Sequence, residues 1–345
     1  MSPRPIPDDL LPWVMSNLPE FSGRSSEFKV IAGDASNRRY FRLRLDGRTF
    51  IVAEAPPATE KNIEFVALQQ LLDGAGVRVP KIYAVDIPRG YLLLEDLGDQ
   101  VLLPALNSDT VGRYYRQAFQ PLMAMAQADT ASAGLGHYDS ALLGEELSRF
   151  DQWFVGELLD YTLNDSELSI LSRLGTKLVA NALEQPQVLV HRDFHSRNLM
   201  LLAGDELAVI DFQDAVVGPV TYDLVSMLKD CYIVWPDSQV EQWALEYRDA
   251  AVTAGIIAKV DDALFIRWFD WMGLERHIKV LGTFARLYLR DGKAAYLDDL
   301  PMVIAYTRAT LSRYAAAEPV FAEFRDWFED TLIPLIEAQP WSEVT

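Results

Sequence analysis

The sequence predicts an α+β protein with two lobes, a small β-rich lobe followed by a larger helical lobe. Two observations support this prediction: residues 26–95 contain five segments with strand patterning, and the chain beyond residue 220 has helical patterning almost throughout. We expect the first lobe to span residues 1–98 and the second residues 99–345. A chain of 345 residues is long enough to give each lobe its own core, with a ligand cleft between them.

The strand predictions in the first lobe depend on alternation and on turn residues. Apolar and polar residues alternate in "YFRLRL" (40–45), and "DG" at 46–47 is typical of a hairpin turn into "RTFIVAEA". Apolar residues at helical spacing then indicate a helix that ends at Gly74 and Gly76. The stretch "VPKIYAVDIPRGYLLLEDLG" contains two further strands, the second of which ends at Glu95.

After residue 98 the spacing of apolar residues is helical. It predicts helices over about 108–132, 140–160 and 164–184. Short strands flank the polar segment at 191–198, and the rest of the chain is predicted to be helical.

Composition excludes several classes of protein. Half of the residues are apolar, so the chain is globular, and no apolar run is long enough to cross a bilayer. The net charge of -19 argues against binding to nucleic acid. The first residues lack a signal-peptide pattern, and the single cysteine, Cys231, cannot form an internal disulfide. We therefore expect a cytoplasmic protein with neither a membrane nor a nucleic-acid partner.

The segment "HRDFHSRNLM" (191–200) places a dense group of ionisable residues between two strand-like stretches. Asp193 and Asn198 are separated by four residues, and Asp211 follows the strand-like stretch "LAVI". Phosphotransferases use this spacing. An Asn amide and an Asp carboxylate are oxygen ligands suited to Mg²⁺, so Asn198 and Asp211 are the predicted metal ligands for transfer from ATP. Asp193 is then the group that accepts the proton of the attacking hydroxyl.

A different reading of this segment is a polar hairpin loop in which Asp and Asn only form turns. We prefer the catalytic interpretation because the pieces occur in order, each at the end of a predicted strand.

Two segments, "LVHRDFHSRNLML" and "LAVIDFQDAVVGPVTYDLVSML", resemble the aminoglycoside phosphotransferase and choline kinase family, whose fold is protein-kinase-like. The resemblance covers most of the chain. It implies that His191 heads the catalytic loop and that Asp223 braces the loop from below. Taken locally, Asp223 is equally well explained as an aspartate at the start of a helix.

The resemblance extends in part to the first lobe. "IAGDASNRRYFRL" is similar to the strand–turn–strand that covers the ATP phosphates, with Gly33, Ser36 and Asn37 at the turn. "LLLEDLG" is similar to the linker whose backbone binds adenine, here through the Glu95 carbonyl and the Leu97 amide. Read alone, these two stretches are an ordinary turn and an ordinary strand end.

One position departs from the family. Its third strand normally carries a phosphate-pairing lysine, and Ala53 lies near that place. Arg42 or Arg44 on the preceding strand is the predicted substitute, with Arg42 assigned to the nucleotide, unless Glu54 contributes differently. The glutamate that normally pairs with this lysine corresponds to Glu60 or Glu64.

The acceptor is predicted to be a small alcohol or sugar, because only about ten residues separate Asp211 from the next helix and no A-P-E follows. "DASNRRYFR", "HRDFHSRN" and "ERHIKVLGTFARL" most resemble the bacterial anomeric kinases of cell-wall recycling. That resemblance implies phosphorylation of the C1 hydroxyl of N-acetylmuramate or N-acetylglucosamine. Separately, we expect a monomer. The predicted sugar contacts are cationic or polar: His195, Arg197, Arg276 and His277. For His195, a hydrogen bond to the loop backbone is an equal alternative.

Two other functions remain open. A choline or aminoglycoside kinase would need an aromatic cage or clustered carboxylates, for which Trp153, Trp268, Trp271 and the pair Glu145–Glu146 are candidates. We expect these tryptophans to be core residues and Glu145–Glu146 to be solvated. Glu275 and Lys279 are similarly interpreted as a surface i,i+4 pair. The second function is a non-catalytic nucleotide-binding module.

Overall fold

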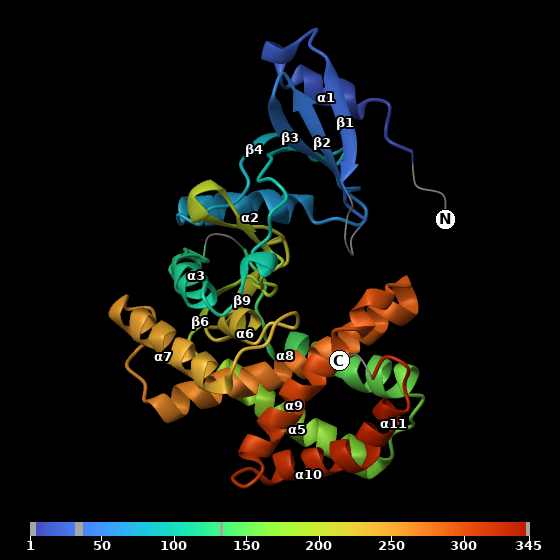
Figure 1. The fold of residues 1–345 in the computed structure, drawn as a ribbon, viewed down its shortest axis with the longest axis vertical. Helices are drawn as coiled ribbons and strands as arrows, with labels where there is room; N and C mark the ends of the chain where they lie inside the picture. The colour runs from blue at the N-terminus through green and yellow to red at the C-terminus, as the bar shows by residue number, and fades with distance from the viewer. Residues whose placement is uncertain (1–4, 32–36, 132–133, 343–345) are drawn as a thin grey trace. The chain divides into compact units, whose positions relative to one another are not determined.

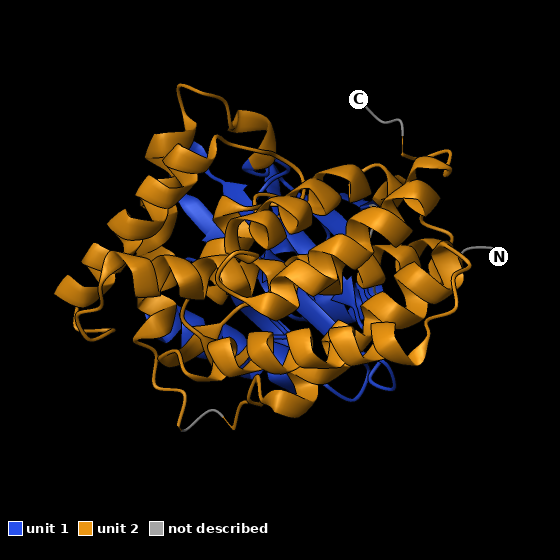
Figure 2. Ribbon diagram, turned by 90° about the horizontal axis from the view of Figure 1, so that it is seen from below, with its two compact units in different colours: residues 1–102, 198–214 blue, residues 103–197, 215–345 orange. Residues whose placement is uncertain are grey.

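The computed structural model describes residues 5–31, 37–131 and 134–342. The chain forms two compact units: one contains residues up to 102 together with 198–214, and the other contains 103–197 and 215–345 (Figure 2). The first unit is built on a β-sheet and the second is mainly helical (Figure 1), so the predicted α+β class is confirmed. Residues 198–214 of the first unit lie, in sequence, within the predicted helical lobe.

The first unit contains a five-stranded antiparallel sheet with all five predicted strands. Its order is β1-β2-β3-β5-β4, with Tyr40 opposite Ala53 and Arg42 opposite Ile51 on β2 and β3. The strand bounds are β1 (Ser26–Ile31), β2 (Arg39–Leu45), β3 (Arg48–Glu54), β4 (Ile82–Asp86) and β5 (Tyr91–Glu95).

Alternation along β2 separates the two faces of this sheet. Phe41, Leu43 and Leu45 are fully buried in an apolar cluster with α1 (Leu10–Ser16) and the 3₁₀ turn η1 (Pro19–Phe21). Tyr40, Arg42 and Arg44 therefore face the other way. On β2, the second face of the sheet is thus the polar one.

The remaining elements of the first unit are a helix and a short hairpin. The helix α2 (Asn62–Gly74) ends where Gly76 adopts a positive φ, as the glycines predicted. The hairpin pairs β7 (Leu199–Leu201) with β8 (Leu207–Val209) around η4 (Ala203–Asp205). The Val209 N–H donates to the Arg78 carbonyl, and Leu102 donates to Leu199, so the hairpin is hydrogen-bonded to the N-terminal residues of this unit.

The second unit is a helical assembly around the 30-residue helix α8 (Figure 1). A small antiparallel pair, β6 with β9, precedes α6. The bounds are η2 (Leu103–Ala105), α3 (Val111–Ala126), α4 (Ser140–Arg149), the π-helical η3 (Phe150–Leu158), α5 (Asp165–Leu183), β6 (Gln187–Val190), β9 (Val216–Pro219), α6 (Tyr222–Leu228), α7 (Asp237–Thr253), α8 (Asp262–Asp291), η5 (Ala294–Leu297), α9 (Leu300–Tyr314), α10 (Pro319–Trp327), η6 (Phe328–Leu332) and α11 (Ile333–Glu337).

Helix α8 is buried over most of its length. It starts at Asp261, whose carboxylate accepts the Leu264 N–H (2.8 Å), and ends at Gly292 in the left-handed conformation. Leu274 and Leu281 belong to its apolar cluster with the η3 phenylalanines. Among the residues that the structure describes, no helix combines the length and the hydropathy needed to cross a bilayer.

Candidate active site

The polar segment 191–197 is a loop that follows β6 in the second unit, and two buried aspartates hold it. The Asp223 carboxylate accepts the N–H groups of His191 (2.6 Å) and Arg192 (3.0 Å). Asp230 accepts the N–H (3.0 Å) and the hydroxyl (2.5 Å) of Ser196. Charged acceptors make strong hydrogen bonds to backbone donors, so both ends of the loop are fixed.

Arg192 adopts a positive φ of 78°, a conformation that costs free energy in a residue other than glycine. Its guanidinium pairs with Glu146, which is fully buried on α4. Glu146 also pairs with Lys279 of α8 (3.0 Å) and accepts the Tyr138 hydroxyl. These contacts and the two bonds to Asp223 stabilise the strained turn next to Asp193.

Asp193 is ionised at neutral pH. Burial raises the pKa of its carboxyl, but the basic groups around it, with Lys279 the largest contributor, outweigh burial and hold the pKa below its usual value. Burial raises the pKa of Asp223 to about 6 against the opposing effect of His191. A carboxylate kept charged among cations is equipped to accept a hydrogen bond from a hydroxyl group.

His195 and Arg197 surround Tyr232. The His195 ring meets Tyr232 edge-on at 5.4 Å, and burial lowers the pKa of the imidazole, which is therefore neutral. Among the described residues, the buried Nδ1 of His195 has no hydrogen-bond partner. Arg197 is exposed and its guanidinium carbon lies 3.5 Å from the Tyr232 ring centroid. Both side chains therefore have polar groups suited to a ligand.

The other two predicted sugar contacts lie inside α8. Arg276 is 4% exposed and donates to the Cys231 sulfur (3.4 Å). His277 is fully buried, stacks on Tyr306 at 4.8 Å, and places Nε2 3.3 Å from the Lys229 carbonyl. Burial lowers the pKa of His277 well below its usual range. A sugar contact by Arg276 or His277 stays a prediction.

The prediction that Glu146, Glu275 and Lys279 are exposed to solvent is wrong. Glu145 is exposed, but Glu146 is fully buried, as is Glu275, and Lys279 is 9% exposed. The surface interpretation failed because neighbouring helices cover this side of α8. By contrast, Trp268 and Trp271 are buried and Trp153 packs against the core cluster, as predicted.

In the first unit, Asn198 precedes β7 and Asp211 follows β8, so both lie at the open end of this antiparallel hairpin. The Asn198 carbonyl accepts the Ile210 N–H at 3.1 Å. Asp211 is exposed, has φ of 66°, and accepts a hydrogen bond from the Gln213 amide (2.8 Å). In the described part of the chain, no group of three or more His, Cys, Asp or Glu is arranged so that it could hold a metal ion. One amide and one carboxylate do fit Mg²⁺, which usually keeps phosphate and water as further ligands.

Most of the predicted nucleotide contacts are described. Gly33 and Ser36 lie outside the described residues. Asn37 is exposed, and its N–H donates to Glu60 Oε1 (3.0 Å). The Glu95 carboxylate is paired with Arg78 and accepts the Lys81 N–H (3.1 Å), while Leu97 is half-buried.

Arg42 is held by the segment that follows β5. Its guanidinium pairs with Asp96 (2.7 Å) and Asp99 (2.8 Å) and donates to the Gly98 carbonyl (3.2 Å). Asp96 also accepts the Gly98 N–H (3.0 Å), so Arg42 fixes the turn at the end of the predicted adenine-binding linker. Arg42 as a nucleotide contact stays a prediction.

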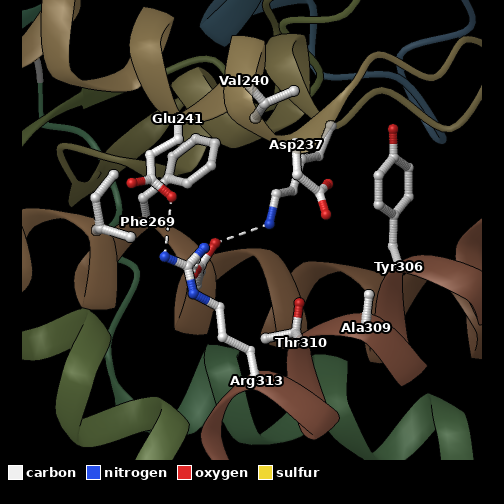
Figure 3. A pocket seen from close by; sticks show the side chains of 11 residues that line it. Asp237, Val240, Glu241, Phe269, Tyr306, Ala309, Thr310 and Arg313 are labelled. Carbon is white, nitrogen blue, oxygen red and sulfur yellow. Dashed lines mark hydrogen bonds and ion pairs between the residues drawn. The ribbon is translucent and has the colours of Figure 1, made fainter.

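A small pocket in the second unit is lined by Glu241, Tyr306 and Arg313 (Figure 3) and by the buried Asp270. Its carboxylate pairs with Lys229 (2.8 Å) and Arg313 (3.1 Å), and Arg313 also reaches Glu241 (2.9 Å). The volume of about 40 Å³ holds little more than water. We infer that this cluster stabilises the fold, because Asp270 holds Lys229, the residue before Asp230.

The buried carboxyl group of Glu275 allows the effect of burial on its ionisation to be tested. Burial and the nearby Glu146 raise the pKa of Glu275 to about 8, against the opposing effects of Lys279, Arg276 and Arg192. Neither carboxyl oxygen has a hydrogen-bond partner among the described residues. The group is therefore protonated in the folded chain at neutral pH and ionised in the unfolded chain.

We expect Glu275→Gln to stabilise the protein, and the gain to grow as pH rises. A folded-state pKa above the unfolded value stabilises the wild type fully below about pH 4.3, and this contribution is lost as pH rises towards 8. Gln resembles the protonated carboxyl group and cannot ionise, so the variant keeps this stability as the pH rises. Urea unfolding at about pH 6 and about pH 9 measures the difference. Glu145→Gln, at the exposed neighbour of Glu146, is the control and should show no such growth; an equal gain at both pH values contradicts the assignment.

The comparison with known families decides the class of the chain. Residues 27–257 match the model of the phosphotransferase enzyme family. The chain belongs to this family. The predicted family and the predicted class of enzyme are confirmed.

Relatives in this family cover most of the chain. An N-acetylmuramate/N-acetylglucosamine kinase of Pseudomonas putida is 43% identical, over 82% of this chain and 83% of its own length. Kinases of the same name from Pseudomonas aeruginosa and Neisseria meningitidis are 40% and 36% identical, over 87% and 90% of this chain and 90% and 92% of their own lengths.

Solved structures of other kinases share the fold at low identity. A choline kinase of Streptococcus pneumoniae matches with a TM-score of 0.61 and 14% identity, over 88% of this chain and all of that one. An ethanolamine kinase of Plasmodium vivax matches with 0.59 and 13%, over 87% and 84%. These matches confirm the predicted protein-kinase-like fold.

Three residues around the predicted catalytic loop were missed from sequence: Asp230, Glu146 and Lys279. Asp230 lies seven residues after Asp223, just beyond the end of α6, and this closeness to Asp223 in sequence is the signal that could have found it. Glu146 and Lys279 had no comparable signal, because their pairing joins α4 to α8 across more than a hundred residues.

Proposed function

We propose that this chain transfers the γ-phosphoryl group of ATP to the C1 hydroxyl of N-acetylmuramate or N-acetylglucosamine. The carrying observation is the identity of 36–43% to three kinases of that name over at least four-fifths of the chain. The braced loop with an ionised Asp193 supports the same reaction.

In this reaction Asp193 accepts the hydrogen bond of the sugar hydroxyl and orients its oxygen toward the γ-phosphorus. The oxygen–phosphorus bond forms, the bond to ADP breaks, and the proton passes to Asp193. Asp223, Asp230 and the Glu146–Arg192 pair keep the loop in one conformation throughout. Positioning of this kind supplies much of the catalysis in phosphoryl transfer.

Asn198 and Asp211 would hold Mg²⁺ through their side-chain oxygens. The ion supplies neutralisation of the phosphate charge. Gln213 restrains Asp211 through its amide, which limits the rotation of the carboxylate. On the nucleotide, we assign Gly33, Ser36 and Asn37 to the phosphates and the Glu95 and Leu97 backbone to adenine, within a nucleotide-binding lobe of residues 1–98.

For the sugar, Arg197 is the described side chain best suited to the lactyl carboxylate of N-acetylmuramate. It is exposed, carries a permanent charge and is held against Tyr232. His195, with its unsatisfied Nδ1, is suited to a hydroxyl or amide group of the sugar. We also propose that the chain acts as a cytoplasmic monomer, without a nucleic-acid or membrane partner.

Phosphorus NMR of the products tests the proposal. With ATP, Mg²⁺ and N-acetylmuramate, we expect a sugar 1-phosphate, and the same with N-acetylglucosamine. Choline and aminoglycosides, assayed in parallel, should give no phosphorylated product. Transfer to choline or an aminoglycoside but to neither amino sugar would overturn the proposal, as would ATP binding without transfer to any of them.

A further inference from the structure

The third strand of the first unit, β3, contains no lysine. In protein kinases, the third strand carries a lysine that pairs with the ATP phosphates and with a helix glutamate. Ala53 on β3 is fully buried and has no charge. Opposite it on β2 is Tyr40, and just before β2 stands Arg38.

Arg38 is 4% exposed, which is rare for arginine and requires partners. Its Nε lies 3.7 Å from Glu60, and its Nη1 donates to the Tyr40 hydroxyl at 3.4 Å. The guanidinium carbon lies 4.8 Å from the centroid of the Phe65 ring on α2. Arg38 is thus a buried cation fixed on one side by a glutamate and an aromatic ring.

Glu60 reproduces the glutamate half of the kinase pair. It stands two residues before α2, and besides pairing with Arg38 it accepts the Asn37 N–H. Glu64, the other candidate, is exposed. A cation–glutamate pair therefore exists in this unit, with the cation supplied from the start of β2 instead of from β3.

The side chains packed around Arg38 extend to Phe212, the neighbour of the predicted metal ligand Asp211. Phe65, under the Arg38 guanidinium, stacks on Phe212 at 4.9 Å, and Phe212 directly follows Asp211. Burial raises the pKa of Tyr40; Arg38 opposes this rise, and the charges of Asp211 and Glu60 add to it. Tyr40 is therefore close enough to both Arg38 and Asp211 to feel their charges.

The other three arginines near this position either pair with other carboxylates or lie toward the far end of β2. Arg42 is paired with Asp96 and Asp99, and Arg39 with the buried Glu54. Arg44 is exposed near the far end of β2, six residues from Arg38. Of these four arginines, Arg38 is the one connected to Asp211 through packed side chains.

We propose that Arg38 is the cation that pairs with the α- and β-phosphates of ATP, in the place of the family's lysine. The inference rests on the proposed use of ATP. Guanidinium stays charged when buried and binds two phosphate oxygens through parallel N–H groups, so it can take this role from a different strand. Glu60 is then the positioning residue that keeps Arg38 turned toward the nucleotide.

The test compares ATP with adenosine, because a phosphate contact affects only the first. Dissociation constants are measured by calorimetry for the wild type, Arg38→Met and Arg38→Lys. We expect Arg38→Met to weaken ATP binding roughly 10- to 100-fold, as for loss of a charged hydrogen-bond pair, and to leave adenosine binding unchanged. Arg38→Lys should recover part of the loss.

Arg24→Met, at an exposed arginine of the same unit, is the control and should leave both constants unchanged. Equal weakening of ATP and adenosine, or ATP binding by Arg38→Met as tight as in the wild type, overturns the proposal. If Arg38→Met does not fold, Arg38→Lys decides by the same ratio. The readout does not depend on the acceptor, so failure of the sugar kinase assay and failure of the Arg38 proposal remain distinguishable.

Discussion

Replacing Asp193 with asparagine is expected to lower kcat for sugar phosphorylation by roughly 10²- to 10⁴-fold, the usual contribution of a positioned proton acceptor. The amide is close to the carboxylate in size, but it cannot take the proton of the attacking hydroxyl. Asp193 is ionised because Lys279 and the other basic groups around the loop favour its charged form. We expect the affinity for ATP to change little. A coupled assay for ADP gives kcat, and calorimetry gives the nucleotide dissociation constant.

The control for this prediction is Asp249→Asn, at an exposed aspartate whose partner is the neighbouring Arg248. It should leave kcat unchanged. Thermal unfolding of Asp193→Asn establishes whether the loop is still held by Asp223 and Asp230. Wild-type kcat in a folded Asp193→Asn would remove Asp193 from the chemistry and with it the mechanism proposed above.

The second large effect is expected in stability, at Gly282 of α8. A Cβ at this position would overlap the Arg149 carbonyl and lie 2.5 Å from the Phe150 nitrogen, where α4 passes into η3. Backbone atoms cannot move aside as a flexible side chain can. We expect Gly282→Ala to lower the free energy of unfolding by about 3 kcal/mol or more, at the upper end of overpacking effects. Urea unfolding followed by circular dichroism measures this change.

Gly273→Ala is the matched control, because Gly273 is a buried glycine of the same helix. Its Cβ would meet Val225 at 3.6 Å and Lys229 at 3.7 Å, which is ordinary contact. Alanine also favours the helix by about 1 kcal/mol relative to glycine. This variant should be as stable as the wild type or more so. Similar losses for both glycines would show that helix α8 does not approach the η3 backbone as described.

Local patterns were sufficient for the first unit. Alternation in "YFRLRL" and the "DG" turn predicted β2 and β3, and the structure has both strands with the hairpin register that the turn requires. The helical spacing over about 140–160 was also correct, but the structure divides it into α4 and a π-helical segment at Phe150. That change occurs where α8 approaches, a contact that no local pattern reports.

Prediction failed at charged residues whose exposure depends on distant segments. Glu275 and Lys279 have the i,i+4 spacing of a surface pair, and only the helices packed against α8 make them buried. The sequence analysis named Arg42 or Arg44 of β2 and not Arg38, which stands just before this strand, because sequence spacing does not say which arginines carboxylates already hold. The structure engages Arg42 with Asp96 and Asp99 and places Arg38 beside Glu60.

The sequence by itself determined the order of the elements, the α+β class, and the residue types of the catalytic loop, since these follow from periodicity, turn chemistry and short spacings. The tertiary structure alone decided which charges are buried and what each one pairs with. The physical reason is that desolvation and ion pairing depend on atoms brought within a few ångströms by packing, as when α4 and α8 join Glu146 to Lys279.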